Sequence, residues 1–303
     1  MKCFYIAFLL VISFQFTFLE AQEWCQKSNY PSTGKFSPLA FSIGDTGYVC
    51  CGRDQNFSNS KELWQYDPWN DIWTKKKDFP GVARRFGIAF TIDSLAYVGA
   101  GFTGSSTPSD MHSYNPSTDS WQAIASYPGS GGRGSLSASV GGKGYAGGGG
   151  TNTNVFSDFY EYNPSTNLWT ALKSFAFGNR TGGIMVSING KIYAGLGHDR
   201  ISDFKDLWEY DPANDSWKRM ADLPGVGRLQ ASCFVVDKKL IVGGGFRLFV
   251  GKLLDDYYEY DPTSNSWTAI SGFKAGKRSH SASFEVKNRG YLVTGRDSLN
   301  NGI

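Results

Sequence analysis

The stretch Leu207-Trp208-Glu209-Tyr210-Asp211-Pro212-Ala213-Asn214-Asp215-Ser216-Trp217 decides the fold of this chain. It reads as a short strand, a tight turn and a second strand, because Asp-Pro suits the first half of a type I turn. Tyr210 stands seven residues before Trp217. Nothing in the stretch suggests catalysis. Its importance is that the chain repeats it.

The same tyrosine, Asp-Pro or Asn-Pro turn and tryptophan occur five times with a constant spacing. The pairs are Tyr66 and Trp73, Tyr114 and Trp121, Tyr162 and Trp169, Tyr210 and Trp217, and Tyr260 and Trp267. Successive tryptophans lie 48, 48, 48 and 50 residues apart. A fixed period of this length indicates an array of equivalent supersecondary units.

Each repeat also has a first half that precedes the tyrosine. It contains a basic residue, a run of small and apolar residues, a turn and a strand that ends in glycines. Residues 180–197 give the clearest example, with Asn189-Gly190 at the hairpin turn. One repeat therefore predicts four antiparallel strands in about 48 residues. No segment shows helical periodicity, so the chain is expected to be all-β.

The distribution of side-chain size predicts how the units are arranged. The first strand of each unit is rich in glycine, serine and alanine, as in residues 134–139 and 279–283. The third and fourth strands carry the bulky tyrosine and tryptophan. Strands with small side chains fit around a crowded central axis, and large side chains fill the widening gap between neighbouring sheets. This taper predicts a β-propeller.

The period, the glycine pair after the second strand, and the tyrosine and tryptophan resemble the kelch repeat over nearly the whole chain after residue 21. The chain is also similar to exported bacterial kelch proteins that are often described as galactose-oxidase-like. That likeness implies the fold only, because one fold hosts many functions.

The length predicts a six-bladed propeller whose last blade is split. Residues 22–303 divide into blades at about 33–80, 81–128, 129–177, 178–225 and 226–275, with 276–303 plus 22–32 as the sixth. Glu23-Trp24 through Pro31 aligns with Ile72-Trp73 through Pro80, 49 residues later. We therefore expect the N-terminal strand to close the last blade as its fourth strand and to hide the sheet edges.

The third strand of the last blade should begin near position 305, after the final residue, Ile303. Either this blade has three strands or the sequence is a C-terminally incomplete copy. We favour the second alternative, because unpaired backbone groups inside a closed blade are costly.

Residues 1–21 have the layout of a cleaved signal peptide. Lys2 precedes an apolar run from Phe4 to about Leu19, and a small residue, Ala21, follows. The alternative is a transmembrane anchor, but a run of about 16 residues is short for a membrane span. We therefore expect an exported protein that is periplasmic, bound at the cell surface or secreted.

Charge and cysteine content favour an ordinary globular surface. The net charge of +3 is scattered along the chain and gives no reason to expect nucleic-acid binding. Cys25, Cys50, Cys51 and Cys233 lack the spacing of a metal site. A bridge from Cys25 to Cys50 or Cys51 and plain buried thiols both remain open. We expect a monomer that uses no cofactor.

The predicted ligand site lies on one face of the disc. The connections into each first strand and those between second and third strands share that face. It gathers the basic residues that open the repeats, and His198 and His280 join them. The predicted ligand-binding residues are Lys35, Arg84, Arg133, Arg180, Arg228, Arg278, His198 and His280. Arginine forks suit carboxylates, phosphates or sulfated sugars.

The resemblance points in the same direction, because matching arginines line this mouth in kelch proteins that bind acidic peptides. The alternative is that each arginine pairs with a loop carbonyl or an aspartate and only stabilises the fold. We expect a binding or scaffold protein that recognises a protein or a glycan.

Two enzyme classes are weighed against binding. Copper radical oxidases share the architecture but need two tyrosines and two histidines on one metal. This chain has three histidines, and His112 falls in a third strand away from the axis. A sialic acid mutarotase or epimerase would need an acid and base pair, for which His280 with Glu285 is the one candidate. We assign no catalytic residue and no metal ligand, and keep a sugar-active enzyme as the alternative function.

Overall fold

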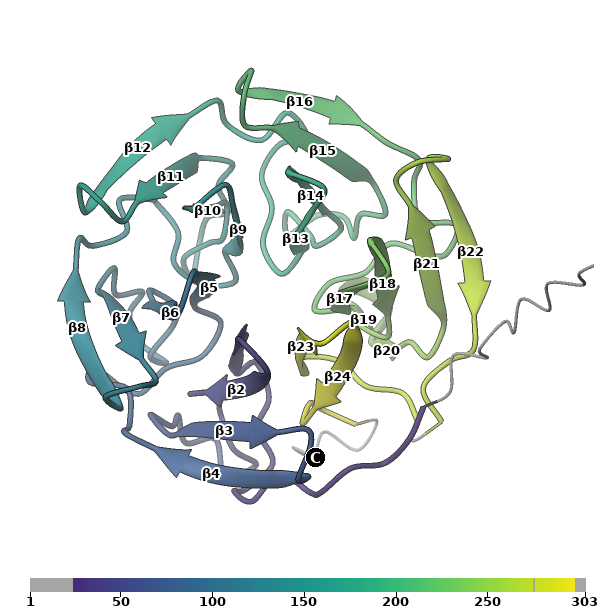
Figure 1. Cartoon of the computed structure of the whole chain (residues 1–303). Coiled ribbons are helices and arrows are strands. Elements are labelled where there is room, and N and C mark those ends of the chain that lie inside the picture. The colour runs from purple at the N-terminus through teal and green to yellow at the C-terminus, as the bar shows by residue number, and fades with distance from the viewer. Residues whose placement is uncertain (1–23, 275, 298–303) are drawn as a thin grey trace, which may run out of the picture.

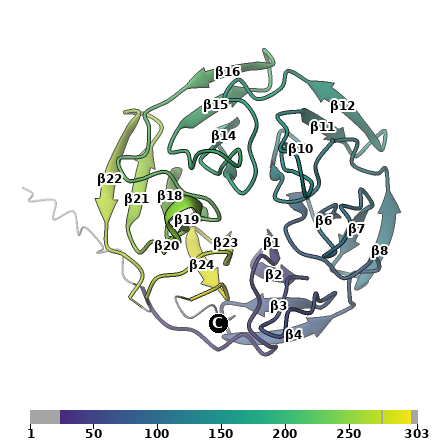
Figure 2. The ribbon, with the colours of Figure 1, turned by 180° about the vertical axis from the view of Figure 1, so that it is seen from behind.

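A computed structural model describes residues 24–274 and 276–297. In this part of the chain the strands form five four-stranded antiparallel sheets and two smaller two-stranded sheets. The large sheets and the β23–β24 sheet stand around a central axis like the blades of a propeller (Figure 1). The same ring is seen from behind in Figure 2. The predicted signal peptide lies outside the described residues.

The blades are numbered in chain order, and the strands of each blade are given from the axis outward. Blade one is β1 (Leu39–Ile43), β2 (Thr46–Cys50), β3 (Leu63–Asp67) and β4 (Ile72–Lys76), and blade two is β5 (Ile88–Ile92), β6 (Leu95–Gly99), β7 (Met111–Asn115) and β8 (Ser120–Ile124). Blade three is β9 (Leu136–Val140), β10 (Lys143–Gly147), β11 (Phe159–Asn163) and β12 (Leu168–Leu172), and blade four is β13 (Ile184–Ile188), β14 (Lys191–Gly195), β15 (Leu207–Asp211) and β16 (Ser216–Arg219). Blade five is β17 (Ser232–Val236), β18 (Lys239–Gly243), β21 (Tyr257–Asp261) and β22 (Ser266–Ile270), and the sixth position holds β23 (Ala282–Val286) and β24 (Arg289–Val293).

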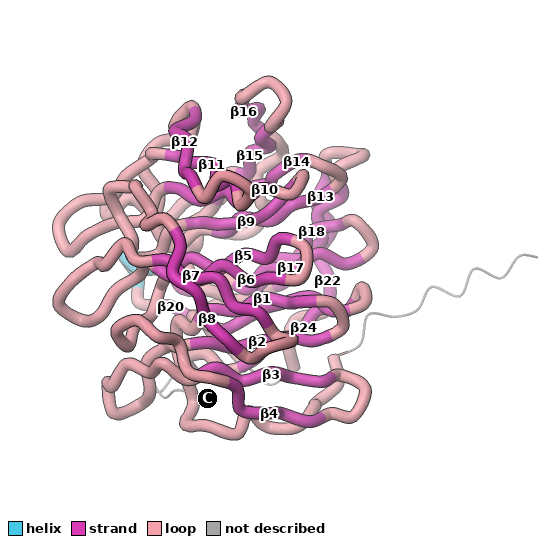
Figure 3. The backbone as a smooth tube through the Cα atoms, turned by 60° about the vertical axis from the view of Figure 1, so that its left-hand side comes forward, coloured by secondary structure: helices cyan, strands magenta, loops and turns pink. Residues whose placement is uncertain are grey.

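The connection between β18 and β21 in blade five contains secondary structure of its own. It contains the hairpin β19 (Phe246–Arg247) and β20 (Lys252–Leu253) and the short helix η1 (Leu248–Val250). Figure 3 shows that the longer loops gather on one side of the disc and the tight hairpin turns on the other. No helix in the described ranges is long and apolar enough to cross a membrane.

A closed ring of backbone hydrogen bonds surrounds the axis. The turn before each first strand contributes one residue whose N–H donates to the carbonyl of its counterpart in the preceding blade. These residues are Ser37, Phe86, Gly134, Gly182, Gln230 and His280, and the six N···O distances lie between 2.7 and 3.2 Å. The bond from Ser37 to His280, at 2.7 Å, joins the sixth position to blade one. Ring closure therefore occurs at the axis.

The ring demands a left-handed backbone at every one of these turns. The φ angles of its six members run from 52 to 69°. Phe86 at 57° and His280 at 59° adopt a conformation that glycine accepts readily and larger residues seldom adopt. The hydrogen bonds on both sides of each turn hold it there.

Neighbouring blades pack through aromatic side chains laid over glycines. A Cβ on Gly144 of blade three would lie 2.1 Å from the ring of Phe90 in blade two, so only glycine fits. Gly290 of β24 meets Phe234 of blade five in the same way, at 2.2 Å. The sixth position therefore packs on blade five as the complete blades pack on one another.

A second ring of hydrogen bonds runs around the outer rim. The indole of each repeat tryptophan donates to a backbone carbonyl of the preceding blade, four residues after that blade's own tryptophan; Trp121 to Lys77 at 2.8 Å is one instance. Trp24 donates to Ser271 at 3.3 Å, and Trp73 donates to Ser28 at 3.3 Å. Trp24 therefore stands where the tryptophan of a sixth blade belongs.

The expected N-terminal strand is not formed. Residues 24–38 contain no strand, although Trp24 occupies the outer position that the alignment with Trp73 predicts. In the complete blades the fourth strand pairs with the third. In the described part of the sixth position no third strand is present, so the N-terminal segment has no backbone to pair with.

The four cysteines that the structure describes are free thiols. Cys50 and Cys51 are fully buried in blade one, while Cys25 is exposed and unpaired. Burial raises the pKa of the Cys50 thiol well above its usual value.

The turn after each third strand ties two blades together. In blade four, Tyr210 packs on Trp217 with ring centroids 4.8 Å apart, and its hydroxyl donates to Asp215 at 2.9 Å. Asp215 also accepts from the backbone N–H of Lys173 in blade three, at 3.2 Å. One carboxylate thus accepts hydrogen bonds from a buried hydroxyl of its own blade and from a backbone N–H of the neighbouring blade.

We expect Asp215→Ala to destabilise the protein by about 1–3 kcal/mol, because the Tyr210 hydroxyl loses its acceptor. The measurement is the free energy of unfolding in urea. Asp222→Ala is the control, since it removes an exposed ion pair with Arg219 and should change stability by less than about 1 kcal/mol. Equal losses in both variants would contradict this role for Asp215.

Candidate functional site

Arg84 and Arg228 are buried inside the fold, and each forms an ion pair with a partly exposed aspartate. Both side chains are 0% exposed. Arg84 donates to both oxygens of Asp110 at 2.8 and 2.9 Å and to the Ala100 carbonyl at 2.9 Å. Arg228 repeats this geometry with both oxygens of Asp256, each at 2.8 Å. Each guanidinium ties the start of its blade to the loop before its own third strand.

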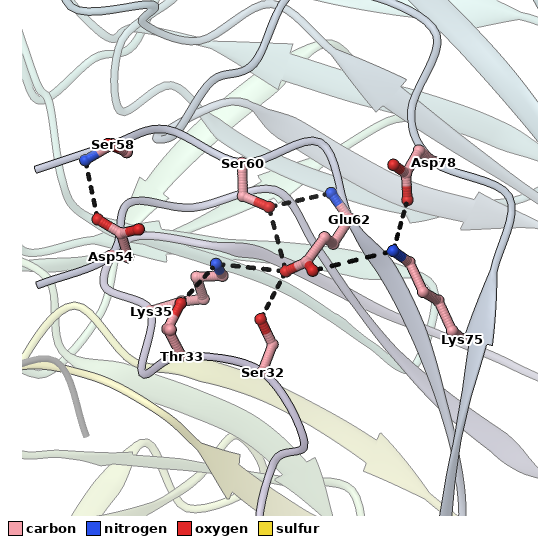
Figure 4. Close-up of polar contacts among 9 residues, drawn as sticks. All are labelled: Ser32, Thr33, Lys35, Asp54, Ser58, Ser60, Glu62, Lys75 and Asp78. Atoms are coloured by element: carbon pink, nitrogen blue, oxygen red, sulfur yellow. Dashed lines mark hydrogen bonds and ion pairs between the residues drawn. The ribbon is translucent and has the colours of Figure 1, made fainter. Parts of the chain in front are cut away.

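Two further members of the predicted set are held in a similar way. Arg180 donates to Asp206 at 2.7 Å and lies 3.4 Å from the centroid of the Phe204 ring. Lys35 is 3.3 Å from Glu62 and also donates to Thr33 (Figure 4). Their placement matches the structural alternative that the sequence left open.

Arg278 has no carboxylate at the matching position of its blade in the described residues, although the Asp297 carboxylate is near enough to raise its pKa against the larger, lowering effect of burial. It donates to the Thr294 carbonyl at 3.2 Å and lies over the Phe273 ring at 4.3 Å. In the complete blades the matching carboxylate immediately precedes the third strand, as Asp110 precedes β7 and Asp256 precedes β21.

Arg133 differs from the other predicted arginines by one position in the repeat. The bridge between Arg133 and Gly150 is equivalent to the bridges between Arg85 and Phe102 and between Thr181 and His198. Arg133 therefore corresponds to Arg85, and Gly132 takes the position of Arg84. The guanidiniums of Arg85 and Arg133 converge on one aromatic pair, at 5.1 and 4.7 Å from the Phe102 ring.

Basic side chains from several blades meet beside the axis. We call them the inner-face cluster. Its members are Arg53, Arg85, Arg133, His198, Arg200, His280 and Arg296. Of the predicted ligand residues, Arg133, His198 and His280 are brought together here.

The charges in the cluster affect one another. Burial, together with the nearby Arg53 and Arg133, lowers the pKa of Arg85 to about 10. Burial lowers the pKa of His280 to about 3, and the guanidiniums of Arg296, Arg133 and Arg85 add to this shift. His280 is therefore neutral at physiological pH.

Neutral groups provide the hydrogen-bond acceptors of these arginines. Arg85 donates to the Asn59 side-chain oxygen at 2.8 Å, Arg53 to the Phe57 carbonyl at 3.1 Å and Arg200 to the Asn152 carbonyl at 2.8 Å. Within the described ranges, neither Arg85 nor Arg133 forms an ion pair with a carboxylate. The cluster is thus a concentration of positive charge in which Arg85 and Arg133 have only neutral hydrogen-bond partners or aromatic neighbours in the described structure.

The sequence could have revealed the difference between the two groups of arginines. The residue that turns toward the axis directly follows the buried one in the repeat, as Arg85 follows Arg84. In blade three a glycine fills the buried position, and Arg133 becomes the first basic residue. Arg296 lies in the loop after β24 at the repeat position of His198, so the rule that placed His198 on this face applies to it as well.

The residues proposed for an enzyme are not assembled. The His280 Nδ1 atom is 2.7 Å from the Ser279 hydroxyl. Glu285 lies at the far end of β23 and accepts from the Asn288 N–H at the hairpin turn. Strands rise about 3.3 Å per residue, so roughly 16 Å separate the two positions. His112 is on β7 against Phe79, and the described part of the chain contains no group of three potential metal ligands.

We expect Arg228→Ala to destabilise the protein by about 3 kcal/mol, because Asp256 loses its buried partner. Arg133→Ala, which breaks no ion pair, should cost less than about 1 kcal/mol. Urea unfolding followed by tryptophan fluorescence compares the two. A small loss for Arg228→Ala would show that this arginine does not stabilise the fold.

The kelch motif family model matches residues 180–224. No curated protein matches the sequence. Among solved structures, that of YjhT superimposes with a TM-score of 0.77 and 19% identity, and the match covers 90% of this chain and 94% of that one. At this identity the likeness shows the fold alone. The ring of four-stranded sheets makes the chain a β-propeller, and the motif match over residues 180–224 shows that its repeat is of the kelch type.

Proposed function

We propose that this propeller is a binding protein and that its inner-face cluster recognises an acidic segment of a partner protein. The observation that carries the proposal is the convergence of Arg85 and Arg133, both without a carboxylate partner in the described structure, on the Phe86 and Phe102 rings. The signal peptide that the sequence predicts would bring this encounter outside the cytoplasm.

The electrostatics of the cluster favour an anion. Burial and neighbouring positive charges lower the pKa values of Arg85 and Arg133, so their charged forms are poorly compensated. A carboxylate between the two guanidiniums would relieve that cost. Charge-assisted hydrogen bonds to arginine are also stronger and more directional than neutral ones.

Exposed apolar side chains on the same face favour a protein over a small anion. They lie at the tips of the loops between second and third strands. Phe57 is 61% exposed in blade one, Ile201 is 80% exposed in blade four, and Phe249 is 53% exposed in blade five. Apolar groups beside arginines are typical of protein interfaces.

We expect a fluorescein-labelled hexaglutamate peptide to bind the protein, with an affinity that falls as salt rises. The double variant Arg85→Ala with Arg133→Ala should weaken binding at least tenfold in fluorescence anisotropy, since it removes both unpaired guanidiniums. Arg219→Ala on the outer rim is the control for net charge. Equal affinity of the double variant and the wild type would refute the proposed site.

The same face supports a second function, a sugar-active enzyme. The arginines of the inner-face cluster could hold a sugar carboxylate beside the neutral His280 ring, whose lowered pKa makes the imidazole a weak base. The discriminating experiment is NMR of freshly dissolved sialic acid anomers with and without the protein. Faster anomer exchange that is lost in His280→Gln would favour the enzyme, and an unchanged rate would leave binding as the function.

A further inference from the structure

The linker that enters blade four departs from the linkers that enter blades two and five. All three linkers start alike, because the N–H groups of Phe79, Phe175 and Leu223 each donate, at 2.8 Å, to the carbonyl two residues before the third strand of the blade just completed. The next three residues are Pro-Gly-Val at positions 80–82 and 224–226, but Ala-Phe-Gly at 176–178. Phe177 therefore stands where the other two linkers have glycine.

Glycine at this position lies directly against an arginine and aspartate pair. A Cβ on Gly81 would lie 2.5 Å from Oδ2 of Asp110 and 2.6 Å from Nη2 of Arg84. Gly225 of blade five meets its arginine in the same way, at 2.5 Å. The Nε atom of Arg84 donates to the Val82 carbonyl of this linker, at 2.8 Å. A larger residue does not fit beside a pair held in this geometry.

The pair of blade four is incomplete. Arg180 donates to one carboxylate oxygen of Asp206, at 2.7 Å, whereas Arg84 donates to both oxygens of its aspartate. Arg180 Nε and Asp206 Oδ1 are buried and have no hydrogen-bond partner in the described structure. The guanidinium lies 3.4 Å from the centroid of the Phe204 ring and 5.3 Å from that of Phe177. Buried polar atoms without partners are rare in native proteins, so this pair calls for an explanation.

A cavity of about 380 Å³ lies beside the incomplete pair, between the linker and the outer strands of blade four. We call it the blade-four pocket. Aromatic, acidic and basic side chains line it in equal numbers: Phe177, Phe204 and Trp208; Asp203, Asp206 and Asp222; Arg180, Lys205 and Arg219. None of them belongs to the inner-face cluster. The blade-four pocket is therefore a separate site.

The lining indicates the chemistry of the ligand. Three acidic and three basic side chains balance, so the pocket carries no net formal charge that would favour an ion. Hydroxyl groups donate to carboxylates and accept from guanidinium or ammonium groups, so a molecule rich in hydroxyls suits both kinds of side chain. Aromatic rings offer flat apolar faces to the C–H side of a sugar ring. The volume also lies in the range of small-molecule sites, roughly 300–1,000 Å³.

The polar groups at the pocket are within reach of a ligand to different degrees. The side chains of Arg219 and Asp222 are 59% and 33% exposed, and that of Asp206 is 12% exposed. Trp208 is partly buried, and its indole N–H donates to Asp206 at 3.0 Å, which fixes the ring beside the pair. Exposed charges at the entrance and a fixed ring further in form a built site rather than a bare surface.

We propose that the blade-four pocket binds the ring of a neutral sugar. The sugar stacks on the aromatic lining, and its hydroxyls pair with Asp222, Arg219 and the Arg180–Asp206 pair. Phe177 opens the pocket by keeping the linker away from that pair. The proposal does not depend on the function of the inner-face cluster.

The test gives blade four the linker of its sister blades. The triple variant Ala176→Pro, Phe177→Gly and Gly178→Val carries the Pro-Gly-Val of blades two and five, so the linker can close on the pair. The probes are the methyl glycosides of glucose, galactose, mannose and N-acetylglucosamine, titrated into the whole protein and followed by saturation-transfer NMR. At least one should bind the wild type saturably in the millimolar range. The triple variant should bind it at least tenfold more weakly and should melt no lower than the wild type.

A second variant and two controls keep the result clear. Asp222→Ala, at an exposed residue, should weaken binding at least fivefold without lowering the melting temperature. The double variant Arg85→Ala with Arg133→Ala should bind the glycoside as the wild type does. Binding of none of the four glycosides, or unchanged binding by both the triple variant and Asp222→Ala, would overturn the proposal. Methyl glucuronide binding more tightly than every neutral glycoside would also overturn it, because the site would then select a negative charge.

Discussion

The ring of backbone hydrogen bonds at the axis is the constraint on which the molecule depends. It forces a left-handed turn before every first strand, including the turns at Phe86 and His280, where larger residues tolerate that geometry poorly. Because the ring is closed from Ser37 to His280, it fixes the positions of the first strands, β23 included, around the axis. The two-stranded sixth position can therefore complete the circle.

The arginines divide into two groups because of where this ring places consecutive residues. Arg84 and Arg228 precede the turn and reach outward to a carboxylate in their own blade, where they replace solvation with paired hydrogen bonds. Arg85 and Arg133 stand one residue further and reach the axis, where aromatic rings and other guanidiniums surround them. One position in the repeat thus separates a structural arginine from a candidate ligand-binding one.

At the outer rim, aromatic side chains and their hydrogen bonds connect neighbouring blades in the same way in every repeat. Tyrosine, tryptophan and an Asp or Asn form one unit that joins each blade to its neighbour, and Trp24 extends the unit to the N-terminal segment.

The fold could be predicted from the sequence because every repeat contains the same local pattern. The period, the turn residues and the distribution of side-chain size all predict a β-propeller. The alignment of Trp24 with Trp73 was sufficient to place the N-terminal segment at the outer rim, but its pairing as a strand depends on a partner strand that local sequence cannot supply. The sequence showed the basic residues at the start of each repeat, but it did not show which way their side chains point. Only the tertiary structure decided which guanidiniums meet a carboxylate and which converge at the axis, because burial and charge pairing arise between residues that lie far apart in the chain.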